Sequence, residues 1–168
     1  MTIADRFRLD GRSALVTGAG RGIGRACAVA LAQAGAEVWL AARTREEIEQ
    51  AAEEIRAAGG SANVAVCDVT SSEQIKQTVQ KIPLLDILVN NAGSNIPEPF
   101  VDVSEEHLDR LLNLNVRAAF LVAQAAARKM LEAPERKARG GAIIHMSSQM
   151  GHVGAVDRSV YCLTKHAL

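Results

Sequence analysis

The sequence has no net charge, no long apolar run and few cysteines, and each of these absences excludes a class of protein. Lys and Arg together number 19, as do Asp and Glu, so no basic face for nucleic acid is expected. No apolar stretch is long enough to span a membrane, and residues 1–10 carry charges where a signal peptide needs an apolar block. We therefore expect a cytoplasmic protein whose partner is a small molecule.

The three cysteines, Cys27, Cys67 and Cys162, are an odd and scattered set without metal-ligand spacing. This arrangement predicts reduced, buried thiols and no metal site. The sequence also contains no internal repeat and no low-complexity tract. With 168 residues, 48% of them hydrophobic, the chain is long enough to bury a core, which predicts one domain over residues 1–168.

Segments with strand character alternate with segments of helical periodicity. Strands are predicted over residues 12–17, 37–41, 62–67, 85–90 and 141–147, and helices over 22–34, 45–58, 71–81 and 104–131. This alternation predicts crossover units and a parallel sheet covered on both faces. The fold class is therefore α/β, a doubly wound parallel sheet of the Rossmann type. Its ligand crevice should lie at the carboxyl ends of the strands, where the winding reverses.

Four glycines at alternate positions follow the first predicted strand: Gly18, Gly20, Gly22 and Gly24. A predicted helix comes directly after them. Glycines let the main chain approach a pyrophosphate closely, and the free amides at the start of a helix face its charge. The spacing is Thr-Gly, three residues, Gly, one residue, Gly, which differs from the G-x-G-x-x-G fingerprint. A dinucleotide-binding turn is favoured, and a merely flexible connection is the alternative.

A second motif is Tyr161-Cys162-Leu163-Thr164-Lys165, and Ser148 stands thirteen residues before its tyrosine. Residues four apart on a helix share a face, so the ammonium of Lys165 can lie beside the phenol of Tyr161. A phenol in water ionises only near pH ~10, and a nearby cation stabilises the phenolate. The hydroxyl of Ser148 is then a candidate to hold a substrate carbonyl. The alternative is that the tyrosine and lysine form only a solvated helix face.

Taken together, these motifs resemble the short-chain dehydrogenase/reductase family. The residues that carry the resemblance are Thr17-Gly18-Ala19-Gly20-Arg21-Gly22-Ile23-Gly24, Asn90-Asn91-Ala92-Gly93, Asn115, Ser148, and Tyr161 with Lys165. The resemblance implies an oxidoreductase that transfers a hydride between a nicotinamide cofactor and a carbonyl or secondary alcohol. Tyr161 would exchange a proton with the substrate oxygen, and Ser148 would hydrogen-bond to the same oxygen. Lys165 would stabilise the phenolate and hold the nicotinamide ribose.

The resemblance assigns two further catalytic positions. Asn115 stands where a helix interior favours an apolar residue, and its family counterpart bends the helix and fixes a water that links Lys165 to solvent. The alternative is an asparagine satisfied locally by the main chain. Ser147 and Ser148 adjoin at the end of the last predicted strand, where neighbouring residues face opposite sides. The family's spacing to the tyrosine selects Ser148.

The residues after the second predicted strand should decide between NADPH and NADH. An acidic side chain there would bind the ribose hydroxyls and repel a phosphate, but Ala42 occupies that place. Arg43, with Arg21 from the glycine turn, can pair with a ribose phosphate through charge-assisted bonds. NADP is therefore predicted. NAD is the alternative, if Arg43 and Arg45 instead pair with nearby glutamates at the surface.

The resemblance also implies contacts for the rest of the cofactor. Asp68 and Val69 resemble the pair that contacts the adenine, although Asp68 can also cap the helix that follows. Asn90 would stabilise the sheet and approach the adenosine ribose, Gly93 would leave room for the nicotinamide, and Ala92 has a mainly structural role. The full predicted cofactor set is Gly18, Arg21, Gly22, Ile23, Gly24, Arg43, Asp68, Val69, Asn90, Ala92, Gly93, Tyr161 and Lys165.

The sequence ends at Leu168, three residues beyond Lys165, whereas members of the family continue with further strands and a segment over the substrate. We therefore expect a C-terminally incomplete fragment with an exposed sheet edge. Its alternative function is that of a non-catalytic dinucleotide-binding fragment. The complete family fold is expected to form a homo-oligomer through the long helix from Ser104 and the tyrosine helix.

Overall fold

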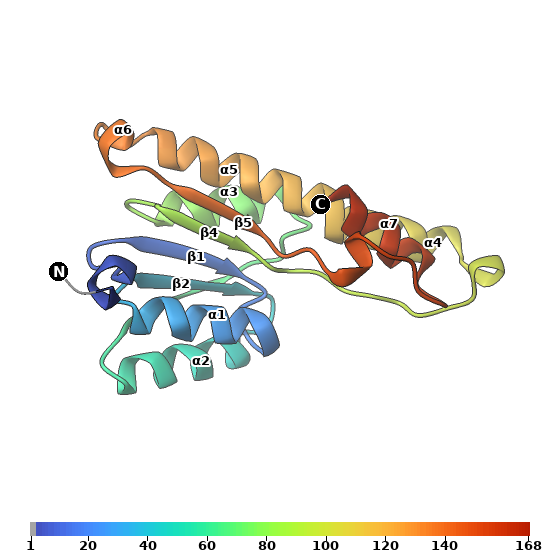
Figure 1. Cartoon of the computed structure of the whole chain (residues 1–168), viewed down its shortest axis with the longest axis horizontal. Helices are drawn as coiled ribbons and strands as arrows, with labels where there is room; N and C mark the ends of the chain where they lie inside the picture. Colours follow the sequence, from blue (N-terminus) through green and yellow to red (C-terminus); the bar gives the residue numbers. More distant parts are fainter. Residues whose placement is uncertain (1–2) are drawn as a thin grey trace.

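The computed structural model of the chain describes residues 3–168, and a parallel sheet of five strands is its centre. The strands are β1 (Ser13–Thr17), β2 (Glu37–Ala42), β3 (Ser61–Val66), β4 (Ile87–Asn90) and β5 (Ala142–His145). Their order in the sheet is β3-β2-β1-β4-β5, with helices on both faces (Figure 1). The winding reverses between β1 and β4, so the doubly wound parallel sheet predicted from the sequence is confirmed.

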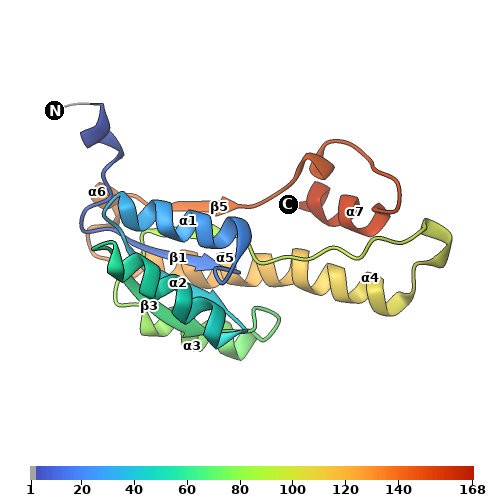
Figure 2. The ribbon, with the colours of Figure 1, turned by 90° about the horizontal axis from the view of Figure 1, so that it is seen from below.

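Helices connect the strands and extend beyond them. They are α1 (Gly22–Gln33), α2 (Arg45–Ala57), α3 (Ser72–Lys81), α4 (Glu105–Leu112), α5 (Ala119–Leu131), α6 (Arg136–Arg139) and α7 (Ser159–Ala167). Three short 3-10 turns are η1 (Ala4–Phe7), η2 (Phe100–Asp102) and η4 (Gln149–Gly151). A π-helical segment, η3 (Asn113–Ala118), joins α4 to α5, so that the two helices form one long rod (Figure 2).

The core has two parts, one on each face of the sheet. Ala14 and Val16 of β1 are fully buried in a cluster with the apolar sides of α1 and α2. Leu15, between them, is buried in the cluster formed by α3 and α5. Alternate strand residues face opposite sides, so a strand that is apolar throughout is stabilised by helices on both faces. This packing holds the carboxyl ends of β1 to β4 together at one edge of the sheet.

At that edge the last helix, α7, packs against α4, η3 and η4. It lies beyond the strand ends, next to the rod of α4 and α5 (Figure 2). β5 is the outermost strand, and its Ile143 and Ile144 are 38% and 47% exposed. The described residues therefore leave this strand partly open while they pack the tyrosine helix against the rest of the fold.

One predicted boundary was wrong in a way that matters for the site. The fifth strand was expected over 141–147, but β5 ends at His145. The main-chain N–H of Ser147 donates to the carbonyl of His145 at 3.1 Å, so the chain turns directly after the strand. Ser147 and Ser148 therefore do not alternate along a strand, and that argument cannot decide between them.

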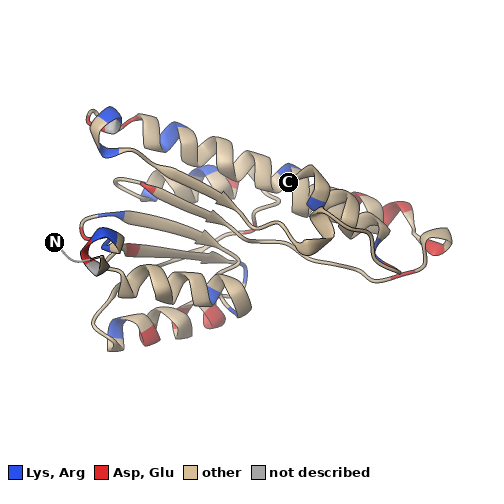
Figure 3. Ribbon diagram, in the orientation of Figure 1, with Lys and Arg blue, Asp and Glu red and all other residues tan. Residues whose placement is uncertain are grey.

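Three findings bear on other classes of function. No helix within residues 3–168 is long and apolar enough to cross a membrane. In the same residues, no group of three or more His, Cys, Asp or Glu side chains is arranged to hold a metal. Basic and acidic residues are interspersed along the ribbon, as on α2, rather than gathered on one element (Figure 3).

Candidate functional site

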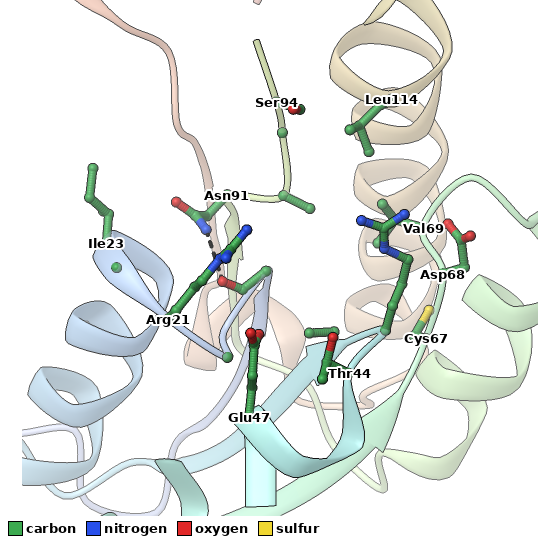
Figure 4. A pocket seen from close by; sticks show the side chains of 17 residues that line it. Arg21, Ile23, Thr44, Glu47, Cys67, Asp68, Val69, Asn91, Ser94 and Leu114 are labelled. Atoms are coloured by element: carbon green, nitrogen blue, oxygen red, sulfur yellow. Dashed lines mark hydrogen bonds between the residues drawn. The ribbon is translucent and has the colours of Figure 1, made fainter. Parts of the chain in front are cut away.

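A pocket of about 510 Å³ lies at the carboxyl ends of β1 to β4, where side chains from the glycine turn, α2 and the ends of β3 and β4 surround it (Figure 4). Nine members of the predicted cofactor set line it: Gly18, Arg21, Gly22, Ile23, Arg43, Asp68, Val69, Ala92 and Gly93. Its position agrees with the crevice expected where the winding reverses. Gly24, Asn90, Tyr161 and Lys165 are not among the lining residues.

The glycine turn needs its glycines for two different reasons. Gly18 and Gly22 have φ values of 64° and 55°, in the left-handed region that favours glycine. A Cβ on Gly24 would stand 2.2 Å from the carbonyl oxygen of Gly18 and 2.6 Å from Nδ2 of Asn91. Gly24 therefore allows α1 to pack against the turn, rather than lining the pocket. Arg21 at the N-cap makes no side-chain cap bond, so the first amides of α1 are left for a ligand.

Thr17 and Asn91 tie the glycine turn to the segment after β4. The hydroxyl of Thr17 accepts hydrogen bonds from the main-chain N–H groups of Asn91 and Ala92 at 3.0 and 3.1 Å. The amide of Asn91 donates in return to the carbonyls of Thr17 and Gly18, at 3.1 and 3.3 Å. These bonds fix the two walls of the pocket relative to each other. Asn91 also lines the pocket.

Asn90 has a place inside the fold rather than in the pocket. It is 5% exposed, its Nδ2 donates to the carbonyl of Ala119 at 2.7 Å, and its Oδ1 accepts from the hydroxyl of Thr17 at 3.4 Å. These contacts join β4 to β1 and α5. The structure therefore shows the sheet-stabilising contacts expected of Asn90 but does not bring its side chain to the pocket.

The charged residues at the adenosine end take different positions. Arg45 pairs with Glu49 at 3.3 Å on the surface of α2, whereas Arg43 lines the pocket. Burial alone would raise the pKa of Asp68, but hydrogen bonds from the main chain and hydroxyl of Thr70, together with the charge of Arg43, outweigh it and lower that pKa. Asp68 thus stays a carboxylate beside Arg43.

Asp68 does not cap the helix that follows it. Ser71 is the N-cap of α3, and its hydroxyl accepts from the main-chain N–H of Gln74 at 3.4 Å. The side chain of Asp68 instead accepts from the N–H and hydroxyl of Thr70, at 2.9 and 2.7 Å. The capping alternative for Asp68 was therefore wrong.

The pocket is also lined by residues outside the predicted cofactor set. They are Gly20, Ala42, Thr44, Glu47, Cys67, Asn91, Ser94 and Leu114. Glu47 lies so close to the turn that a Cβ on Gly20 would stand 2.7 Å from its Oε2. Burial raises the pKa of the Cys67 thiol, so that this side chain contributes a neutral surface to the pocket. For most of these residues the usable signal was position beside a predicted strand end or turn, but Glu47 and Leu114 lie inside predicted helices and gave no such signal.

The motif near the end of the chain forms one turn of α7. Lys165 Nζ lies 5.7 Å from the centre of the Tyr161 ring, as the four-residue spacing predicted. Lys165 is only 6% exposed, and burial lowers the pKa of its ammonium. That ammonium donates a hydrogen bond to the carbonyl of Met146 at 2.6 Å. The lysine is thus held between the tyrosine helix and the chain that leaves β5.

Gly93 connects this pair with the pocket. It lines the pocket, and a Cβ built on it would lie 3.7 Å from Lys165 Nζ and 3.2 Å from Oδ1 of Asn115. A side chain at this position would therefore press against both groups. The ammonium of Lys165 thus stands directly behind the Gly93 wall, so the glycine-lined pocket and the tyrosine-lysine pair adjoin.

Asn115 is 1% exposed and lies in the π-helical segment η3. Its Oδ1 accepts from the N–H of Ser94 at 2.9 Å, and its Nδ2 donates to the carbonyl of Ser94 at 2.8 Å and to the hydroxyl of Thr164 at 3.1 Å. These partners are remote in sequence, so the alternative of local main-chain satisfaction was wrong. Such π segments occur often at functional sites.

Ser148 begins the short turn η4, where its Oγ accepts from the N–H of Met150 at 3.2 Å. Its neighbour Ser147 donates its hydroxyl to the carbonyl of Lys165 at 3.0 Å. η4 packs against α7, so the serine segment lies beside the tyrosine helix. The hydroxyl of Ser147 is thus bound to α7, whereas that of Ser148 accepts a bond within its own turn.

Comparisons with known proteins agree with this arrangement. The family model described as short chain dehydrogenase matches residues 12–168. L-xylulose reductase from Mus musculus is 41% identical over 162 residues, which cover 95% of this chain and 62% of that protein. The chain spans less than two thirds of the length of such curated relatives.

Solved structures show the same likeness in three dimensions. A short-chain type dehydrogenase/reductase from Mycobacterium marinum has a TM-score of 0.91 at 39% identity, over 99% of this chain and 68% of that chain. A gluconate 5-dehydrogenase from Burkholderia cenocepacia, in complex with NADP and tartrate, has a TM-score of 0.89 at 37% identity, over 99% of this chain and 65% of that chain. Because the family model matches residues 12–168 and these relatives are well above 30% identical to it, the chain belongs to the short-chain dehydrogenase/reductase family.

Proposed function

We propose that this chain carries the cofactor-binding and proton-transfer part of an oxidoreductase that moves a hydride between NADPH and a carbonyl or secondary alcohol. The observation that carries the proposal is the 3.7 Å between Lys165 Nζ and a Cβ built on Gly93. It brings the ammonium of the catalytic pair to the wall of the glycine-lined pocket. The cofactor pocket and the proton-transferring residues thus adjoin and form one site.

The residues present fit a dinucleotide. Gly18 and Gly22 give the turn its left-handed backbone, and no Cβ obstructs the approach to the first amides of α1. Arg21 and Arg43 both line the adenosine end, where they would pair with a ribose phosphate. Val69, beside Asp68, supplies an apolar surface for the adenine. NADP is therefore the proposed cofactor, and the NADP in the gluconate 5-dehydrogenase complex supports that choice.

The nicotinamide, when bound, supplies or accepts the hydride. The proton is transferred by side chains of this chain. Tyr161 donates it to the substrate oxygen in reduction and removes it in oxidation, which is general acid-base catalysis worth roughly a hundredfold to ten-thousandfold. Lys165, buried 5.7 Å from the ring centre, stabilises the phenolate that results. Ser148 hydrogen-bonds to the same substrate oxygen.

The proposal also includes a substrate class, a location in the cell and an oligomeric state. The substrate is a small molecule, and the names of the relatives, L-xylulose reductase and gluconate 5-dehydrogenase, make sugars and sugar acids the first compounds to test. A cytoplasmic location is proposed from the three free cysteines. Assembly into a homo-oligomer is proposed through the rod of α4 and α5 together with α7.

The test is the loss of NADPH absorbance when the chain is mixed with a panel of ketoses and keto acids. The proposal predicts turnover by the native chain and none by Tyr161→Phe, which should bind NADPH with nearly native affinity because only the hydroxyl is removed. Binding of NADPH without turnover by the native chain would leave a non-catalytic dinucleotide-binding protein. Equal turnover in Tyr161→Phe would remove the phenol from the mechanism.

A further inference from the structure

Thr164 is a fully buried threonine between the two catalytic residues of α7, with 0% of its surface exposed. Its hydroxyl donates to the main-chain carbonyl of Tyr161 at 2.8 Å. The same oxygen accepts a hydrogen bond from Nδ2 of Asn115 at 3.1 Å. One hydroxyl therefore serves both the tyrosine helix and the π-helical segment that packs against it.

The contact continues from Asn115 to the pocket. The amide of Asn115 makes paired hydrogen bonds with the main chain of Ser94, with the N–H as donor at 2.9 Å and the carbonyl as acceptor at 2.8 Å. Ser94 lines the dinucleotide pocket. The line Ser94, Asn115, Thr164, Tyr161 thus joins the pocket wall to the main chain of the catalytic tyrosine. Both amide protons of Asn115 are used in it, so the loss of any member leaves a buried polar group unpaired.

The opposite side of α7 is held by different bonds. Lys165 Nζ donates to the carbonyl of Met146, and Ser147 donates its hydroxyl to the carbonyl of Lys165, at 2.6 and 3.0 Å. These two bonds anchor the lysine to the chain after β5. Both partners lie in the segment after β5, so neither bond joins α7 to the rod of α4 and α5. Among the side-chain hydrogen bonds of α7 in the described structure, the one to the π-helical segment is made by Thr164.

We propose that Thr164 is a positioning residue, whose hydroxyl fixes α7 against Asn115 and so aligns Tyr161 and Lys165 with the Gly93 wall of the pocket. The inference rests on the proposed function of the site and adds a residue to it. Thr164 touches neither pocket nor phenol, so its effect is transmitted through the orientation of the helix. Without the hydroxyl, Nδ2 of Asn115 loses a partner and α7 loses a bond to the wall, so the ammonium and the phenol are no longer held in one arrangement.

The chain offers a direct probe, because Tyr161 is its single tyrosine. Near-ultraviolet absorbance of the phenolate, followed as pH rises, therefore reports on that side chain alone and requires no substrate. We compare native protein with Thr164→Val, which keeps the shape without the hydroxyl, and Thr164→Ser, which keeps the hydroxyl. Thr78→Val is the matched control, because Thr78 is another buried threonine, 5% exposed, on α3.

The expected result is that the absorbance titration of Thr164→Val departs from that of native protein. Thr164→Ser should return the midpoint to the native value, and Thr78→Val should leave it unchanged although its stability falls. With a substrate in hand, Thr164→Val should lower kcat while the KM for NADPH changes little. Circular dichroism shows that each variant compared is folded. If Thr164→Val does not fold, Thr164→Ala and Thr164→Ser make the same comparison.

Three outcomes separate the claims. A native midpoint in a folded Thr164→Val or Thr164→Ala, with Lys165→Met still shifted, overturns the role of Thr164 and leaves the proposed function standing. A Thr164→Ser that titrates like the variant without a hydroxyl shows that packing, not the hydrogen bonds, was responsible, which also overturns the proposal. If Lys165→Met titrates like native protein, the proposed function itself fails.

Discussion

At the scale of single residues, the site is defined by groups that are small or charged for a specific physical reason. Residue 24 must be glycine because a Cβ at this position would stand 2.2 Å from the carbonyl oxygen of Gly18. That oxygen belongs to the main chain and cannot rotate away. Arg43 differs from Arg45 only in its surroundings, since one lines the pocket and the other pairs with Glu49. Both contrasts can be tested with matched substitutions.

Gly24→Ala should open the glycine turn. The added methyl group forces the turn and α1 apart, which we expect to cost about 3 kcal/mol of unfolding free energy and to weaken NADPH binding at least ~10-fold. The measurements are denaturant unfolding and calorimetric titration. Gly154→Ala is the control, because a Cβ there meets nothing within 4 Å. Native affinity in Gly24→Ala would show that the close packing of the turn is not required for binding.

Arg43→Ala should change cofactor preference. Losing a charge-assisted bond to the ribose phosphate should weaken NADPH binding by roughly ten- to a hundredfold, whereas NADH, which lacks that phosphate, should bind as before. Arg45→Ala, which removes only the surface pair with Glu49, should alter neither. The account of the adenosine end is contradicted if Arg43→Ala weakens both cofactors equally.

The residues of the site could largely be proposed from sequence because their signals are local. A glycine every second position and a tyrosine four residues before a lysine can be seen without knowing the fold. Glu47 could not, because its proximity to Gly20 depends on how α2 packs beside the glycine turn. The contact of Asn90 with Ala119 could not be predicted for a similar reason, since it is a property of the packed fold.

At the scale of elements, the strands and helices expected from periodicity are present, and the differences lie where tertiary contacts decide. The long helix expected over 104–131 contains the π segment η3, whose asparagine bonds to Ser94 and Thr164. The fifth strand ends before Ser147 because the chain there turns toward α7, and the hydroxyl of Ser147 bonds to Lys165. Periodicity carries no information about partners so distant in sequence.

A buried ion pair joins α6 to the start of β4 at the opposite end of the sheet from the pocket. Arg139 donates from Nε to Oδ1 of Asp86 at 2.6 Å and from Nη2 to Oδ2 at 2.8 Å, and the carboxylate side chain is 2% exposed. Arg12 and the main-chain N–H of Ser13 also donate to it, at 3.3 and 3.0 Å. The network thereby fixes the chain that leads into β5 against β1 and β4.

Arg139→Met should loosen this junction. The change leaves the Asp86 carboxylate buried with only part of its partners, which we expect to lower the unfolding free energy by about 2–3 kcal/mol. NADPH affinity should stay near native, because the network lies far along the strands from the pocket. Lys137→Met, on the same short helix, is the control and should be nearly neutral. An unfolding curve of Arg139→Met that overlays the native one would show that the pair contributes nothing net.

At the scale of the whole molecule, the same carboxylate predicts how stability depends on pH. Burial alone would raise the pKa of Asp86, but the hydrogen bonds from Arg139, Ser13 and Arg12 and the charge of Arg139 outweigh it and lower that pKa from 3.8 to about 2. The unfolded chain therefore binds the proton more readily than the folded one. The stabilisation is fully present only well above the unfolded pKa of 3.8, and it is lost progressively as the pH falls toward and through the folded pKa of about 2.

Acid unfolding should show this loss. The shift corresponds to roughly 2 kcal/mol of unfolding free energy, which should disappear between pH ~5 and ~2 in native protein. Asp86→Asn, less stable at neutral pH, should lack this part of the slope. The measurement is denaturant unfolding at a series of pH values. Parallel slopes for the two proteins would mean that Asp86 is not the group responsible.

The account as a whole depends on the lysine of α7 stabilising the phenolate next to the pocket, and its most direct test is the absorbance titration of the single tyrosine in native protein and in Lys165→Met. Methionine removes the charge and keeps most of the volume. We predict that the two titration curves differ, because Lys165→Met removes the amino group that lies 5.7 Å from the ring centre. Equal midpoints in two folded proteins would contradict the central claim.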